Sequence, residues 1–336
     1  MKMLPRISTV LYGVALAALV LGVPPLEAKP APSPRIVLSA DADWKFMLGD
    51  PAGAEAPTFD AQSWRTLSLP HDWSIEAAPA EKASTGAGGG YYPAGIGWYR
   101  KVFSAPASWK GKRVSLEFDG VSGDSTFYLN GKRLGTHPYA YTSFHFDITD
   151  QLILNAKNVL AVRADNSLQP ASRWYSGSGI YRHVRVVVTD PIHIAPWGVC
   201  VNAPDPSSAS AKIIVNTQIK NDSAEASSVV VKTIVVGPKG VKLTEPDKTV
   251  ELQPGQSIET DQEVVSNQPS LWSPGPFGPA ARYHSVPNGR GRPKKTFPGR
   301  RAVAHEIDLD HEREAGEAVA GGASYGRGRL RRTCLA

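Results

Sequence analysis

The sequence is poor in cysteine and in long apolar runs. Its 336 residues include two cysteines, Cys200 and Cys334. So few cysteines exclude a disulfide-rich scaffold and a four-cysteine zinc site. Beyond residue 23 no apolar run is long enough to cross a bilayer, which excludes an integral membrane protein once a leader is removed. No histidine, cysteine or carboxylate spacing typical of metal ligands is found, so we expect no metal and no other cofactor.

The chain also lacks excess charge outside its C-terminal end. Residues 275–336 hold twelve basic and six acidic residues, which account for the whole formal net charge of +6. The remaining body is neutral, so we expect no nucleic-acid partner for the folded part. The segment 289–295, GRGRPKK, resembles an AT-hook, whose Arg-Gly-Arg core enters the minor groove of DNA. A DNA-binding tail is the weakest alternative, because one copy in an arginine-rich segment arises easily by chance.

Residues 1–28 are typical of a signal peptide. Two basic residues precede the apolar stretch 9–23, and Ala28 offers a small residue at a cleavage point. The alternative is a single membrane anchor, but this stretch is shorter than the roughly 20 residues of a spanning helix. We therefore expect export to the periplasm or the exterior, without membrane contact after cleavage. In that oxidising compartment Cys200 could pair only with Cys334, and we expect Cys200 to be a buried free thiol instead.

From residue 36 to residue 190 the pattern indicates β-strands throughout. In 114–118, apolar Val114, Leu116 and Phe118 alternate with polar residues, which is the period of a half-buried strand. Asn130-Gly131 predicts a tight hairpin turn. Further strands are expected at residues 144–147, 159–163 and 180–188. Short strands split by Gly, Pro and Asn, with no helical period, favour a jelly-roll β-sandwich.

A second β block follows over residues 191–270. Apolar residues alternate with polar ones along 213–219 and again along 229–235, and Pro254-Gly255 predicts a turn. This spacing fits a small immunoglobulin-like sandwich. Residues 275–336 differ in kind, because only nine of these 62 residues are Val, Ile, Leu or Phe. Such a composition cannot offset the entropy of ordering the segment, so we expect a disordered tail.

Aromatic, amide and charged residues gather in the predicted loops of the first sandwich. They occur in three groups, at residues 69–73, 88–100 and 165–182. Flat aromatic faces bind the C–H patches of sugars while amides and charged groups bond the hydroxyls, although the same residues suit a wet protein interface. We interpret His71 and Asp72 as a hydrogen-bonded corner beside Trp73 rather than as an acid–base pair. Asp residues at strand ends, such as Asp124 and Asp147, are expected there for backbone reasons.

Five strings in these regions carry a family resemblance. They are LPHDWSIE, GGGYYPAGIGWYRKVF, FDGVSGDSTFYLNGKRLG, YAYTSFHFDIT and DNSLQPASRWYSGSGIYRHV, in that order between residues 40 and 190. Together they resemble the N-terminal sugar-binding domain of glycoside hydrolase family 2, of the bacterial β-galactosidase type. The block 191–270 resembles the family's immunoglobulin-like domain, and LWSP at 271–274 resembles the link onward from it.

The resemblance implies a β-galactoside-like carbohydrate partner. Asn166, Arg173, Trp174 and Tyr175 would contact sugar, because loops of this domain reach the rim of the active site in the family. The alternative is that Trp174 and Tyr175 pack against the following domain. In the family that domain is a barrel carrying two catalytic glutamates, which a retaining glycosidase holds about 5–5.5 Å apart.

We expect no catalytic residue in this chain. A barrel needs roughly 200 residues, and none of the nine Asn residues precedes a Glu, as the family's acid/base glutamate usually requires. The compositional change at Gly275 is also what a shifted reading frame in GC-rich DNA would encode. Reading the gene in the other two frames past that codon would decide this hypothesis.

Two functions stay open from the sequence. The chain is the N-terminal fragment of a family 2 glycosidase, inactive alone, or it is a non-catalytic carbohydrate-binding module. The oligomeric state is not indicated by any pattern.

Overall fold

The computed structural model describes residues 35–237, 242–244, 247–269 and 271, together with the backbone of two strands at 284–285 and 300–306. The predicted leader and the AT-hook-like segment lie outside the described residues. In the described part, β-strands dominate and the helices are two short 3-10 turns, η1 (Ser74–Glu76) and η2 (Ala107–Trp109). No helix in those ranges is long and apolar enough to span a membrane.

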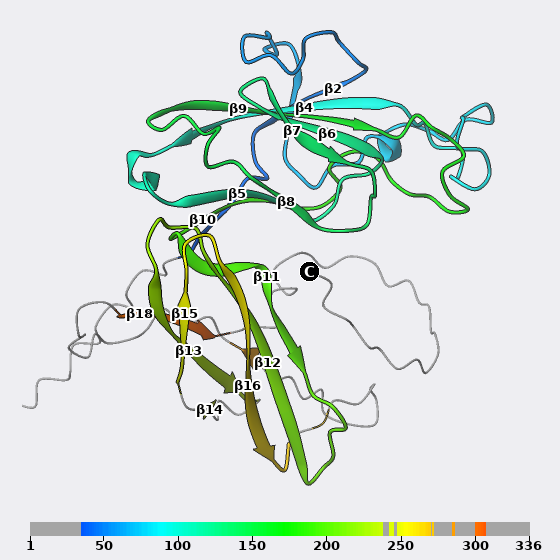
Figure 1. Ribbon diagram of the computed structural model, residues 1–336. Coiled ribbons are helices and arrows are strands. Elements are labelled where there is room, and N and C mark those ends of the chain that lie inside the picture. Colours follow the sequence, from blue (N-terminus) through cyan, green and yellow to red (C-terminus); the bar gives the residue numbers. More distant parts are fainter. Residues whose placement is uncertain are drawn as a thin grey trace, which may run out of the picture. The chain divides into compact units, whose positions relative to one another are not determined.

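The first sandwich consists of two antiparallel sheets that lie in two layers (Figure 1). The larger sheet has the strand order β3 (Arg65–Leu67), β2 (Trp44–Leu48), β4 (Ile96–Ala105), β9 (Ala156–Asp165), β6 (Asp124–Leu129) and β7 (Lys132–His137). The smaller sheet has the order β1 (Ile36–Ser39), β10 (Val184–Thr189), β5 (Arg113–Phe118) and β8 (Phe144–Asp147). Two of the connections between the sheets are long loops. Residues 138–143 join β7 to β8, and residues 166–183 join β9 to β10.

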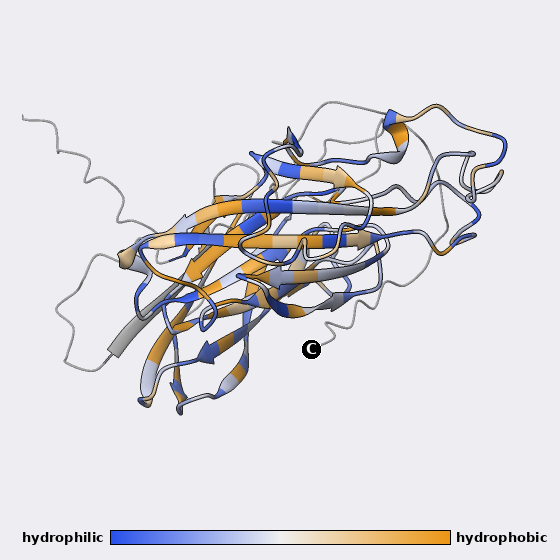
Figure 2. Cartoon of the chain, turned by 90° about the horizontal axis from the view of Figure 1, so that it is seen from above, coloured by the Kyte–Doolittle hydropathy of each residue, from blue (hydrophilic) through white to orange (hydrophobic). Residues whose placement is uncertain are grey.

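The core of this sandwich forms from the alternation that the sequence predicts. Val114, Leu116 and Phe118 on β5 are buried while their neighbours are half-buried, and hydrophilic and hydrophobic colours alternate along the strands in Figure 2. Phe118 packs against Phe127 of the opposite sheet with ring centroids 4.8 Å apart. Each fully buried side chain of this size contributes about 1.5–3 kcal/mol. The layers are therefore held together by the inner faces of their strands.

The predicted hairpin turn is confirmed, and one predicted strand is shorter than expected. Asn130 and Gly131 both have positive φ, +51° and +80°, which suits the turn between β6 and β7. The strand expected at 180–188 begins only at Val184. Before it, Gly179 forms only an isolated bridge with Ser122, and the Ile180 carbonyl accepts the amide of His71. The β-branched run alone did not indicate these contacts.

The second sandwich carries two further sheets. One has the order β11 (Ile192–Asn202), β12 (Ser210–Asn221) and β16 (Ser257–Asn267). In the other, β13 (Ser227–Val236) pairs with β14 (Lys242–Thr244) and β15 (Lys248–Leu252). The predicted inward faces of β12 and β13 are buried, including Ile213, Val215, Val229 and Val231. The all-β prediction of a jelly-roll sandwich followed by an immunoglobulin-like sandwich is confirmed.

The structure bears on two expectations, the disordered tail and the free thiol at Cys200. Within residues 275–336 the structure describes β17 (His284–Ser285) and β18 (Arg300–Glu306), which both pair with β13. The rest of the predicted tail lies outside the described ranges. Cys200 is half-buried on β11 and disulfide-bonded, not a buried free thiol. The partner of this disulfide lies outside the described residues.

Candidate functional site

The connection from β9 to β10 is fixed by the side chain of Asn166. Its Oδ1 accepts a hydrogen bond from the Gly95 amide at 2.9 Å, and its Nδ2 donates to the Gly177 carbonyl at 3.1 Å and to Ser178 Oγ at 2.6 Å. The side chain is 8% exposed. The amide that the sequence assigns to sugar contact is therefore bonded on both sides to neighbouring loops, and it holds the ends of residues 166–178 together.

A second tie joins the same loop to the segment around Asp72. Asp72 Oδ1 accepts hydrogen bonds from the amides of Ser74 and Ser178, both at 3.0 Å. Its Oδ2 accepts from the hydroxyl of Tyr175 at 2.5 Å. Burial, and then the hydrogen bond to Asp72, raise the pKa of Tyr175 far above its usual range. Tyr175 is thus a neutral donor that positions the loop.

The predicted corner at His71 is present. His71 is buried, and Arg65 lies 2.7 Å from its Nε2 while the Tyr99 hydroxyl lies 2.7 Å from its Nδ1. Arg65 donates to Nε2 when that nitrogen is unprotonated, and Glu76 Oε1, 3.2 Å from the same atom, accepts from it when it is protonated. Burial lowers the pKa of His71, against the opposing effect of Glu76. The corner is a buried structural network, as the sequence interpretation has it.

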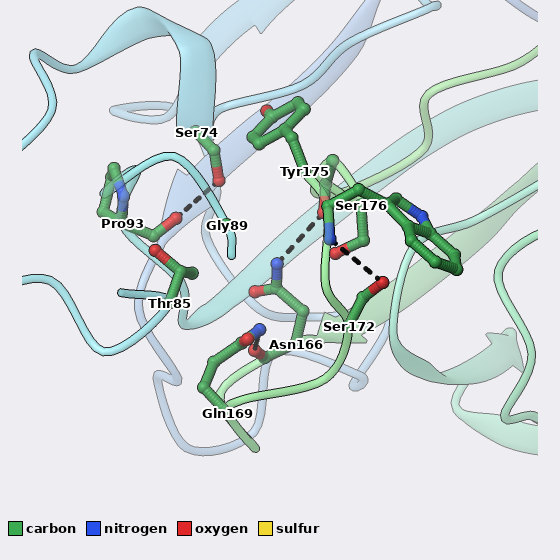
Figure 3. A pocket seen from close by; sticks show the side chains of 11 residues that line it. Ser74, Thr85, Gly89, Pro93, Asn166, Gln169, Ser172, Tyr175 and Ser176 are labelled. Atoms are coloured by element: carbon green, nitrogen blue, oxygen red, sulfur yellow. Dashed lines mark hydrogen bonds between the residues drawn. The ribbon is translucent and has the colours of Figure 1, made fainter. Parts of the chain in front are cut away.

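A small polar pocket lies between these ties, and Figure 3 shows it at close range. Ser74, Thr85 and Pro93 line one side, and the hydroxyl of Ser74 donates to the Pro93 carbonyl at 2.6 Å. Asn166 and Gln169 line the other side. The pocket holds about 10 Å³, which is room for roughly one water molecule and not for a sugar ring. Tyr175 lies against this pocket.

A much larger cleft opens on the other side of the same loop. It has a volume of about 690 Å³, within the roughly 300–1,000 Å³ of small-molecule sites. Arg173 and Trp174 of the β9–β10 connection line it, together with Tyr139 and Tyr141 of the β7–β8 connection. Trp174 is 62% exposed, and its Nε1 lies 3.3 Å from the Tyr141 hydroxyl. The cleft therefore combines exposed aromatic faces with polar groups.

Two carboxylates also line the cleft and are candidates for an acid–base couple. Asp124 and Asp165 are direct cross-strand partners of β6 and β9. Burial acts to raise the pKa of Asp165, but hydrogen bonds from Ser167 and the interaction with Arg163 outweigh it and lower that pKa. A glycosidase acid needs a raised pKa. The carboxyl whose pKa burial does raise, Glu117, does not line the cleft. Asp165 therefore lacks the raised pKa of a glycosidase acid.

The structure brings the four predicted sugar-contact residues into one loop bordered by two pockets. Asn166 and Trp174 line both pockets, whereas Arg173 lines the large cleft and Tyr175 lines the small pocket. Their contact with sugar stays a prediction. Tyr139 and Tyr141 were not singled out in the sequence, although two tyrosines after a proline in a predicted strand connection were a usable signal. In the described ranges, no cluster of three His, Cys, Asp or Glu residues is arranged to hold a metal ion.

Comparisons with known proteins decide the family of this region. Residues 97–192 match the family model described as the glycosyl hydrolase 2 galactose-binding domain-like domain. The chain carries the N-terminal domain of glycoside hydrolase family 2. The matched residues include both walls of the large cleft.

Relatives with known names extend the match beyond this family 2 domain. A β-galactosidase of Bacteroides ovatus, BoGH2A, is 41% identical over 240 residues, which are 71% of this chain and 28% of that protein. A putative β-glucuronidase of Formosa agariphila is 35% identical over 71% of this chain and 22% of its own length. A solved family 2 structure from Bacteroides cellulosilyticus has a TM-score of 0.67 and 34% identity, covering 70% of this chain and 31% of that one. The chain thus spans less than a third of these proteins.

Proposed function

We propose that this chain is the sugar-recognition portion of a family 2 glycosidase that hydrolyses terminal β-galactosides. The similarity to a β-galactosidase over 71% of the chain supports the reaction class. The single observation that carries the proposal is the cleft of about 690 Å³ inside the matched domain, with Trp174 and Arg173 on its wall. In this role the chain binds and orients sugar, while the pair of catalytic carboxylates belongs to another part of the enzyme.

Each predicted residue has a distinct part in this proposal. Trp174 offers an exposed indole face to the C–H patch of a pyranose ring, and Arg173 offers five donors to its hydroxyls. Arg173 is exposed and has no hydrogen bond or ion pair within the described residues, so its donors are available. Asn166 and Tyr175 act by holding the loop, through Gly95 and Asp72.

The test is a titration of the full chain with methyl β-galactoside, followed by calorimetry, together with a chromogenic β-galactoside assay. We expect binding without turnover. Replacing Trp174 by Ala should weaken binding about tenfold, as for an aromatic residue at the centre of a binding surface. Trp197→Ala is the matched control, because Trp197 is 56% exposed and lies outside the cleft. Turnover by this chain alone would contradict the proposal that its role is recognition.

A non-catalytic carbohydrate-binding module is the second candidate function. The exposed aromatic residues of the cleft favour it, because such residues bind sugar without any catalytic partner. Sugar affinity that is equal in this chain and in a longer protein with a catalytic domain would support the module. Affinity that rises when that domain is present would support the glycosidase portion.

We further propose that the chain is exported, on the basis of its basic, apolar and small-residue leader in residues 1–28. Mass spectrometry of the mature N-terminus after expression in a bacterial host would test this. A chain that starts after Ala28 is the expected product, and a chain that retains the leader would contradict export with cleavage.

A further inference from the structure

We infer that the large cleft binds a chain of several neutral sugar units, and that Tyr139 and Tyr141 supply the platform for the units beyond the first. This inference rests on the proposed function for its ligand class. The cleft meets the β9–β10 loop at Trp174 and the β7–β8 connection at Tyr139 and Tyr141. Tyr141 directly adjoins Trp174, with its hydroxyl 3.3 Å from Trp174 Nε1, and Tyr139 extends this aromatic surface further. A single pyranose ring at Trp174 does not cover so long a surface, which is explained by a longer ligand.

The aromatic platform is exposed and yet held in place. Tyr139 is 55% exposed and Tyr141 is 44% exposed, and their rings meet edge to face with centroids 5.7 Å apart. The Tyr141 hydroxyl also accepts the hydrogen bond from Trp174 Nε1. Soluble proteins seldom gather several large exposed aromatic rings in one concavity unless the surface binds a partner. The edge contacts orient these rings before any ligand arrives.

Three hydrogen-bond contacts hold the turn that carries Tyr139 and Tyr141. The Tyr181 hydroxyl donates to the Ala140 carbonyl at 2.8 Å. The hydroxyl of Ser143 donates to the Asp119 carbonyl at 3.2 Å, and His137 Nε2 lies 3.0 Å from Thr142 Oγ1. Because the turn is already ordered, binding costs little conformational entropy there. A preorganised surface of this kind favours binding of an uncharged sugar chain, because little of the binding free energy is lost in ordering the protein.

Around Asp124, the charge of the cleft favours neutral sugars over uronic acids. Its lining includes Asp124 and Asp165 but one cation, Arg173. Asp124 is exposed at the first position of β6, and its carboxylate has no hydrogen bond or ion pair within the described residues. It can accept from sugar hydroxyls, whereas it repels a ligand carboxylate. A repulsion of one charge pair at about 4 Å in water amounts to a roughly fivefold loss of affinity.

The experiment is calorimetric titration of the full chain with β-linked galactose oligomers of one to four units. The inference predicts affinity that rises with the second and third units. It predicts that Tyr141→Ala and Tyr139→Ala remove most of this gain, about tenfold for the trimer. Monomer binding should change little in Tyr139→Ala, whereas Tyr141→Ala also removes the acceptor of Trp174 Nε1 and should weaken it. Tyr91→Ala is the matched control, because Tyr91 is 40% exposed and does not line the cleft. Tyr139 has no side-chain hydrogen bond within the described residues, so its variant should fold even where the Tyr141 variant does not.

The outcomes separate this inference from the proposed function. Affinity that is independent of chain length, or equal in wild type and both tyrosine variants, overturns the platform, whereas binding of methyl β-galactoside at Trp174 would still support the proposed function. A gain with chain length that depends on Tyr141, without any preference for galactose, upholds the platform and contradicts the galactoside assignment. In the charge test, Asp124→Asn should reduce the discrimination against an oligomer that ends in a uronic acid by about fivefold. Unchanged discrimination would overturn the role of Asp124.

Discussion

The hydroxyl of Tyr175 donates a hydrogen bond to Asp72 Oδ2 across 103 residues of sequence. Asp72 at the same time accepts the amides of Ser74 and Ser178 through its other oxygen. One carboxylate thus fixes the segment after β3 and the loop before β10 against each other. The position of Trp174, the residue before Tyr175, depends on this tie.

Removing the hydroxyl should loosen the loop without unfolding the sandwich. For Tyr175→Phe we expect a loss of about 1 kcal/mol in the free energy of unfolding, at the low end for a bond to a charged group because the tyrosine is partly exposed. Chemical denaturation measures the loss, and hydrogen exchange should locate faster opening in residues 172–178. Exchange that is unchanged in this segment would argue against the tie.

Two glycines have nearly the same φ but different surroundings, so the cost of steric contact can be measured apart from the cost of backbone strain. Gly179 has a φ of +78°, and a Cβ there would lie 2.1 Å from the Tyr99 hydroxyl; Gly111 has a φ of +74° and nothing within 4 Å. Gly111→Ala should therefore cost about 1 kcal/mol from backbone strain alone. Gly179→Ala should cost about 3 kcal/mol or more, because the Tyr99 corner must also move. Equal losses in thermal denaturation would show that this contact does not constrain the core.

The corner at His71 predicts a loss of stability in mild acid. Burial lowers the pKa of His71 below its ordinary value of 6.5, so the folded state holds this proton less tightly than the unfolded chain. The stability it contributes is complete above about pH 6.5 and falls as the pH drops below that value. Protonation also removes the acceptor of Arg65 and places two cations together, with Glu76 as the facing anion.

The matched comparison is denaturation of wild type and His71→Gln between pH 7.5 and pH 5. The variant should show a shallower decline, because glutamine does not titrate. Part of the decline should remain, since burial also lowers the pKa of His137, His145 and His193. Identical slopes for the two proteins would mean that His71 does not take up the proton.

The strands could be predicted from the sequence because their cause is local. The alternation at Val114, Leu116 and Phe118, and the Asn130-Gly131 turn, each follow from period and backbone preference alone. The late start of the strand predicted at 180–188 could not be predicted in this way. The residues before Val184 are held by Ser122 and by the amide of His71, which are contacts between residues far apart in the chain.

The candidate site was predictable in its composition but not in its shape. Trp174 and Arg173 stood out because a loop rich in aromatic and charged residues is unusual. Tyr141 gained meaning only when the fold brought it within 3.3 Å of Trp174 Nε1. Asn166 looked like a free amide in the sequence, yet its three hydrogen bonds are made within the protein. Whether a polar side chain is available to a ligand is decided by its neighbours.

Both walls of the cleft are connections that cross from one layer of the sandwich to the other, one from β7 to β8 and one from β9 to β10. A ligand that bridges them would brace the two layers at their open end, so heat should unfold the occupied domain at a higher temperature than the empty one. The aromatic residues of both connections lie outside the β-strands, so they can be replaced during evolution without changing the strands. Sugar preference can then diverge across enzymes that share one framework.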